Sequence, residues 1–110
     1  MDKTHALAAF AALSQPTRLD AFRLLIRAGA EGMAAGEIAA ALSSRQNTMS
    51  ANLAVLHQAG LVRNERQGRS IRYFADLDGT RALLGYLVED CCGGRPDQCQ
   101  PLLAAIASPC

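Results

Sequence analysis

The stretch GEIAAALSSRQNTMSANLAVLHQAGLVRNERQGRSIRYF, residues 36–74, decides the fold. It predicts a short helix over residues 36–42, a break of three residues, and an amphipathic helix over about 46–59. On the short helix we expect three side chains to face inward: Ile38, Ala41 and Leu42. Two helices joined by so short a break are typical of a helix-turn-helix.

The longer of these helices separates apolar from polar side chains. Met49, Leu53 and Leu56 recur at i, i+4 and i+7, and at about 100° per residue this spacing places them on one face. The opposite face is small and polar and carries Asn47, Ser50, Ala51, Ala54 and Gln58. Amides and hydroxyls exchange hydrogen bonds with base edges, and methyl groups let a helix approach a groove closely. An ordinary solvated helix start would expose such residues too, so this face alone does not distinguish the two readings.

A basic β-hairpin is predicted directly after this helix. Two short runs, 62–66 and 70–74, are separated by a glycine that supplies the positive φ of a tight turn. Arg66 and Arg69 flank the tip of this hairpin, and Arg72 lies on its returning strand. Arginines at this spacing suit contacts to phosphates or to the minor groove.

Positive charge is concentrated in this part of the chain. Residues 45–75 carry five arginines against one glutamate, whereas residues 76–110 carry two arginines against five acidic side chains. A basic block within a chain of net charge +1 is typical of contact with a polyanion, although scattered arginines on a solvated face are the simpler reading of charge alone. Break, helix and basic hairpin together predict a mainly α fold with a β-hairpin, the winged helix-turn-helix, which binds double-stranded DNA.

Further helices are expected on both sides of this unit. A first helix ends at Gln15, because a residue before proline avoids the α region, and Pro16 begins a second helix. After the hairpin, Asp78 is a plausible N-cap for a helix that reaches about Cys91, and residues 102–107 predict a brief final helix. The terminal helices are apolar enough to need covering, which is typical of a two-fold homodimer.

Length and composition exclude several classes of protein. A chain of 110 residues supports one compact core, which we expect in a winged helix-turn-helix and dimerisation domain over residues 1–92, followed by a cysteine-bearing tail over 93–110. No apolar stretch reaches the roughly 18 residues of a membrane span, and the N-terminus lacks the features of a signal peptide, so we expect a soluble cytoplasmic protein. We find no nucleophile–base arrangement, phosphate loop or paired catalytic carboxylates, and therefore expect no enzyme.

Four motifs together resemble the ArsR/SmtB metalloregulators of bacteria. They are LSQPTRL at 13–19, EIA at 37–39, MSANLAVLHQAGLV at 49–62 and GRSIRY at 68–73. The resemblance covers nearly the whole chain. It implies a homodimeric winged-helix repressor whose first and last helices form the dimer interface and which leaves its operator DNA when a thiophilic ion binds. It also implies base contacts at Gln46, Asn47, Ser50 and Asn52.

The cysteines narrow this resemblance to one subgroup. All four follow residue 90, while the stretch 33–37 has no cysteine and the expected helix over 78–92 has no histidine, so both familiar ligand sets of the family are missing. The four cysteines are Cys91, Cys92, Cys99 and Cys110. The first three resemble the Cys-Cys pair and later Cys of arsenic-responsive members, whereas a cysteine at the final position is commonly a bystander. Three thiolates suit As(III) or Sb(III), while zinc prefers four ligands.

The hypothesis is therefore a metalloid-responsive repressor that dissociates from operator DNA when Cys91, Cys92 and Cys99 bind As(III) or Sb(III). The tail over 93–110 is then its metalloid-binding segment. Two alternatives remain open. A thiol redox repressor would pair Cys91 or Cys92 with Cys99. A metalloid-binding protein without operator specificity would use the same cysteines. The pattern does not distinguish arsenite, antimonite and an organic arsenical as the signal.

Overall fold

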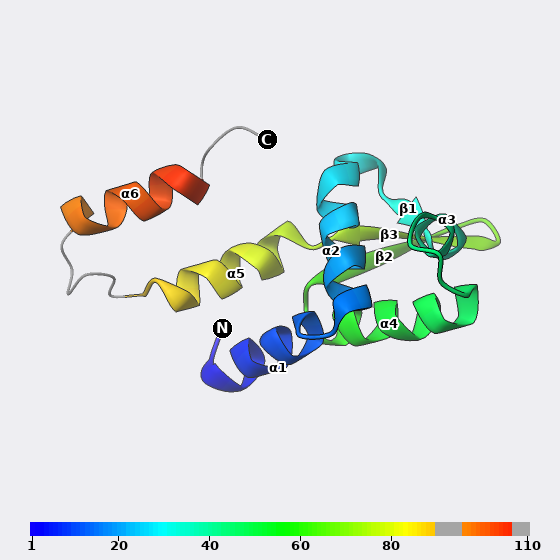
Figure 1. Ribbon diagram of the computed structural model, residues 1–110, viewed down its shortest axis with the longest axis horizontal. Coiled ribbons are helices and arrows are strands. Elements are labelled where there is room, and N and C mark those ends of the chain that lie inside the picture. Colours follow the sequence, from blue (N-terminus) through cyan, green and yellow to red (C-terminus); the bar gives the residue numbers. More distant parts are fainter. Residues whose placement is uncertain (90–95, 107–110) are drawn as a thin grey trace.

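The computed structural model describes residues 1–89 and 96–106, with side chains for 1–89 and 100–106. The order of elements in this part of the chain confirms the predicted mainly α winged helix-turn-helix (Figure 1). The helices and strands are α1 (Lys3–Leu13), α2 (Pro16–Ala28), the 3-10 turn η1 (Gly29–Glu31), β1 (Met33–Ala34), α3 (Ala35–Ala41), α4 (Gln46–Gln58), β2 (Val62–Gln67), β3 (Ser70–Ala75), α5 (Leu77–Leu87) and α6 (Pro96–Ile106).

The core gathers where α2, α3 and α4 meet. Met49, Leu53 and Leu56 are completely buried, as the spacing predicts. On α3 the prediction is wrong at one position, because Ala39 is buried beside Ile38 while Ala41 is exposed. The helix begins at Ala35, and the i, i+3, i+4 positions from there are 38 and 39, so Ala41 falls off the inner stripe.

The predicted break between α3 and α4 is a left-handed turn. Ser43 has a φ of 53°, which is unusual for a residue with a side chain. The N–H of Ser44 donates to the carbonyl of Ala39 at 2.9 Å and closes the end of α3. This compact closure lets α4 begin at Gln46.

The hairpin belongs to a sheet of three antiparallel strands in the order β1-β3-β2. Gln67 pairs with Ser70 across a two-residue turn, in which Gly68 has a φ of 64°. The third strand, β1, was not predicted, because two residues are too short a run to show a periodicity. It pairs Met33 with Tyr73 and Ala34 with Arg72, and so attaches the hairpin to the start of α3.

Helix α1 buries only small side chains. Its inner face consists of Ala6, Ala9 and Ala12, while Leu7 and Phe10 are exposed. The carboxylate of Asp2 accepts the N–H of His5 at 2.8 Å and caps the helix, and this hydrogen bond lowers the pKa of Asp2.

Helix α5 differs from its predicted limits at both ends. Its N-cap is Asp76, not Asp78, because Asp76 has extended backbone and accepts the N–H of Gly79 at 3.0 Å. Asp78 lies in the first turn and pairs with Arg81 at 2.9 Å. The helix ends at Leu87, earlier than the expected Cys91, and Val88 is its C-cap.

The last helix, α6, is longer than the predicted 102–107 because it already begins at Pro96, and proline is favoured in the first helical position. Figure 1 shows α6 on the far side of α5 from the helix-turn-helix. Its apolar side chains Leu102, Leu103 and Ile106 are exposed. Within the described residues, no helix is both long and apolar enough to cross a membrane.

Candidate nucleic-acid interface

Helix α4 presents the polar face that its sequence predicts. The side opposite Met49, Leu53 and Leu56 carries no acidic residue. Its exposed residues are Asn47, Ala51, Ala54, Val55 and Gln58, with Ser50 half-buried beside them. Gln46 is exposed as well, but three residues before Met49 it lies nearer the buried stripe. A helix of this kind can approach polyanionic DNA with amides outward and without charge repulsion.

The start of α4 also favours an approach to DNA. The N-cap, Arg45, makes no side-chain capping bond, and the first backbone N–H groups of a helix carry a partial positive charge. The side-chain oxygen of Asn47 accepts the N–H of Thr48 at 2.8 Å, so its amide NH2 is turned away from the backbone. The Gln46 amide lies over α3, since a Cβ added to Gly36 would meet its Oε1 at 3.3 Å.

The tip of the β2–β3 hairpin carries two exposed arginines, Arg66 and Arg69. Neither forms an ion pair within residues 1–89 and 96–106, whereas Arg63 lies 3.6 Å from Glu65 and over the ring of Phe74. Figure 1 shows the hairpin tip and the start of α4 at the same end of the molecule. The arrangement suits one DNA surface that contacts the helix in a groove and the tip on the phosphates beside it.

Arg72 occupies a different place from the other two predicted hairpin arginines. Its Nε donates to the carbonyl of Glu31 at 2.6 Å, its Nη2 to that of Gly32 at 3.2 Å, and its Nη1 to the carboxylate of Glu37 at 3.3 Å. These hydrogen bonds attach β3 to the beginning of α3. The structure therefore gives Arg72 a role inside the fold, and its predicted contact with DNA stays a prediction.

Asn52 lies away from the exposed face of α4. It is half-buried, and its Oδ1 accepts from Nη1 of Arg18 at 3.4 Å. Nε of Arg18 also donates to the carbonyl of Ala12 at 2.7 Å. Sequence reasoning did not select Arg18, because the contact spans 34 positions along the chain. Arg18 ties the end of α1 to α4, and the structure does not bring Asn52 together with Asn47 and Ser50.

A second exposed surface is apolar. Leu7 and Phe10 on α1 are 58% and 39% exposed, and Leu84 and Leu87 on α5 are 38% and 55% exposed. Large side chains left open to water at helical spacing indicate a surface that another molecule covers. Of the two helices that the sequence predicts at the dimer interface, the first and the last, only α1 belongs to this surface, and α5 is the helix before the last one, α6.

Known proteins share this architecture. A family model described as a helix-turn-helix domain matches residues 13–65. A possible transcriptional regulatory protein from Mycobacterium bovis, solved as the fragment 1–100, is 32% identical with a TM-score of 0.62; the match covers 79% of this chain and 92% of that one. The same fragment solved in solution is a homodimeric winged helix-turn-helix DNA-binding domain of a possible ArsR-family regulator; it is 29% identical over 84% of this chain and 85% of that chain, with a TM-score of 0.62. The chain belongs to the ArsR family of transcriptional regulators.

Two more structures of transcriptional regulators are similar. An ArsR-like transcriptional regulator from Rhodococcus sp. RHA1 is 27% identical, has a TM-score of 0.68 and matches over 94% of this chain and 93% of that one. A possible transcriptional regulator for arsenical resistance is 28% identical over 70% of this chain and 77% of that chain, with a TM-score of 0.61. No curated protein sequence matches the chain.

The cysteines of this ArsR-family chain lie mostly beyond the described residues. Cys91, Cys92 and Cys110 fall outside them, and Cys99 belongs to the first turn of α6 without a described side chain. Elsewhere in the described part no group of three His, Cys, Asp or Glu side chains could hold a metal ion. The predicted metalloid site therefore stays a prediction.

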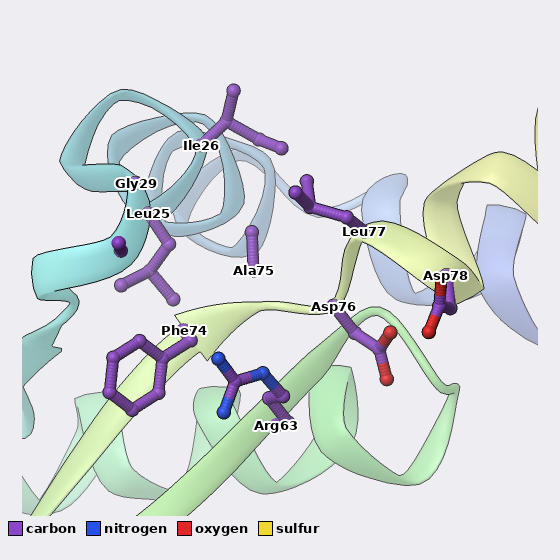
Figure 2. A pocket seen from close by; sticks show the side chains of 10 residues that line it. Leu25, Ile26, Gly29, Arg63, Phe74, Ala75, Asp76, Leu77 and Asp78 are labelled. Carbon is purple, nitrogen blue, oxygen red and sulfur yellow. The ribbon is translucent and has the colours of Figure 1, made fainter.

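One cavity of this ArsR-family chain adjoins α5. It measures about 470 Å³ and lies between the end of α2, the base of the hairpin and the start of α5 (Figure 2). Buried Leu25 and Phe74 form part of its wall, and Leu77 of α5 is 60% exposed at its edge. The start of α5 is thus not packed tightly against α2.

Proposed function

We propose that this ArsR-family regulator is a metalloid-responsive repressor. As a homodimer it binds operator DNA, and it dissociates when As(III) or Sb(III) is bound by Cys91, Cys92 and Cys99. The observation that carries the DNA-binding part is the polar face of α4, which lacks acidic residues, at the same end of the molecule as the arginines of the hairpin tip. Helix and tip are complementary to a groove and its flanking phosphates.

The homodimer is supported by the exposed leucines of α1 and α5 and by the homodimeric relative from M. bovis. A two-fold dimer places two copies of α4 about 34 Å apart, one turn of DNA, and therefore reads a palindrome. Isolated winged-helix subunits would make only half of these contacts.

The metalloid response is supported by the donor set. Cys91 and Cys92 follow the end of α5 within a few residues, and Cys99 lies at the start of the next helix. Sulfur ligands select soft ions, and ligation requires the deprotonated thiolate. A similar structure belongs to a possible regulator for arsenical resistance, which agrees with this choice of ion.

The test begins with DNA selected from a random pool by the wild-type protein. In a fluorescence-anisotropy titration, arsenite should weaken operator affinity by ~100-fold, a coupling free energy of about 2.7 kcal/mol. Cys91→Ser, Cys92→Ser and Cys99→Ser should each lose this response while keeping DNA affinity, and Cys110→Ser is the matched control. X-ray absorption should count three sulfur ligands around arsenic.

Other outcomes identify the alternative functions. Release by peroxide without arsenite would replace the metalloid sensor with a thiol redox repressor. Tight arsenite binding by a protein that selects no DNA sequence would leave a metalloid-binding protein. Release that is equal in the wild type and all three cysteine variants would disprove the assigned ligands.

A further inference from the structure

The recognition helix ends in a turn that only glycine adopts easily. Gly60 has a φ of 81°, its N–H donates to the carbonyl of His57 at 3.1 Å, and the N–H of Leu61 donates to that of Leu56 at 3.1 Å. This pair of bonds is the Schellman closure of a helix. It leaves the Gly60 and Leu61 carbonyls available at the surface that α5 meets.

Helix α5 begins on this closure. The backbone N–H of Asp76 donates to the carbonyl of Leu61 at 2.9 Å, and the side chain of the same residue accepts the N–H of Gly79 at 3.0 Å. The Thr80 hydroxyl donates to the Asp76 carbonyl at 2.8 Å. Asp76 therefore joins the end of α4 to the first turn of α5.

The backbones of the two helix ends also touch. A Cβ added to Gly79 would overlap the carbonyl oxygen of Gly60. The missing side chain thus permits a contact in which the Cα–H of Gly79 faces that oxygen. A backbone contact of this kind allows little adjustment, because no flexible side chain separates the two backbone segments.

The other side of α5 is open. The cavity of about 470 Å³ lies between its first turn and the end of α2, with Leu77 at the edge (Figure 2). Further along the helix, Leu83 is the one buried residue of α5. Leu83 shares a buried cluster with the alanines of α1, and α5 packs against α1 there. The direction in which α5 leaves the core is therefore set at its first turn by the junction with α4 and further along by α1.

We infer that Gly79 is a positioning residue for DNA recognition. Its contact with Gly60 sets the angle between α4 and α5, and this angle sets the separation of the two recognition helices in the dimer. The inference rests on the proposed function, since it needs α5 in the dimer interface and α4 on DNA. A side chain at position 79 would push α5 away from the end of α4 and change the separation that the protein reads.

The test compares Gly79→Ala with Gly85→Ala. Both replace a glycine of α5 with the same helix-favouring residue, but a Cβ at Gly85 would meet nothing within 4 Å. Affinity is measured for the selected operator and for versions whose centre is one base pair longer or shorter. We expect Gly79→Ala to bind the selected operator at least tenfold more weakly and to prefer an altered spacing. Gly85→Ala should keep the wild-type preference.

Two further measurements separate positioning from folding. The salt dependence of binding to non-specific DNA should be unchanged in Gly79→Ala, because the phosphate contacts remain. If Gly79→Ala does not fold, Asp76→Ala takes its place: it removes the cap but keeps the backbone bond to Leu61, so tolerance of altered spacings should widen. Wild-type spacing preference in the folded Gly79→Ala variant, or in Asp76→Ala where that variant replaces it, would overturn the inference. A wild-type protein that selects no DNA would instead disprove the proposed function.

Discussion

At the scale of single residues, the arginines of this protein fall into two groups. Arg66 and Arg69 are exposed at the hairpin tip, whereas Arg72 and Arg18 use their guanidinium groups within the fold. The distinction arises from the groups that lie opposite each side chain. Backbone carbonyls face Arg72 and Arg18, and only solvent or a ligand can face the tip.

This difference predicts that alanine substitutions at Arg69 and Arg72 change different quantities, the first DNA binding and the second stability. Arg69→Ala should leave the free energy of unfolding unchanged and reduce the slope of log affinity against log salt by about 0.9, the value for one lost phosphate contact. Arg72→Ala should lower the free energy of unfolding by about 1.5–3 kcal/mol, because it removes charged hydrogen bonds to Glu31 and Glu37. Urea unfolding and salt-dependent anisotropy measure the two quantities. A salt slope that is equal in wild type and Arg69→Ala would exclude the phosphate contact.

At the scale of elements, the turn between α3 and α4 and the junction between α4 and α5 hold the recognition helix at both ends. The turn between α3 and α4 places Ser43 in the left-handed conformation, which is unfavourable for a residue with a side chain. The junction between α4 and α5 uses glycine in the left-handed position. The front of the recognition helix therefore carries a conformational cost that its rear does not.

Ser43→Gly should relieve this cost. A left-handed conformation is unfavourable by about 1–2 kcal/mol for a residue with a side chain, so the free energy of unfolding should rise by about 1 kcal/mol. Ser44→Gly is the control, because Ser44 does not have a positive φ and glycine there should reduce stability through chain entropy. Urea denaturation of both variants measures the effect. A Ser43→Gly protein less stable than the wild type would contradict this account of the turn.

At the scale of the whole molecule, the proposed regulation depends on symmetry. Each subunit carries one recognition helix, and affinity for a palindrome arises only when two are held together. The apolar surface of α1 and α5 is the surface that would hold them. Linkage then requires that operator DNA weaken arsenite binding by the same factor as arsenite weakens DNA binding.

Leu87→Glu should separate the subunits. Leu87 is 55% exposed in one chain, and burial of a leucine in an interface is worth about 1.5–3 kcal/mol, which a charge would reverse. We expect a folded monomer in sedimentation equilibrium, with operator affinity reduced to that for non-specific DNA. Ile71→Glu, on the hairpin and 40% exposed, should remain a dimer. A dimeric Leu87→Glu protein would place the interface elsewhere.

The sequence by itself determined the helix-turn-helix, the hairpin and the polar face of α4. Their signals are local. Met49, Leu53 and Leu56 recur within one helix, Gly60 follows the end of α4, and Pro16 begins α2. It also indicated that the terminal helices are apolar enough to need covering, because the apolar content of a helix can be read without knowing its partner.

Only the tertiary structure decided which residues of this framework stay exposed and which hold it together. Arg72 meets Gly32 and Glu31 across 40 and 41 positions, and Arg18 meets Asn52 across 34. The strand β1 and the contact of Gly79 with Gly60 are likewise products of folding. The physical reason is that spacing along a chain specifies the direction of a side chain relative to its own helix or strand. The atom that it meets there belongs to another element, whose position exists only once the core has formed.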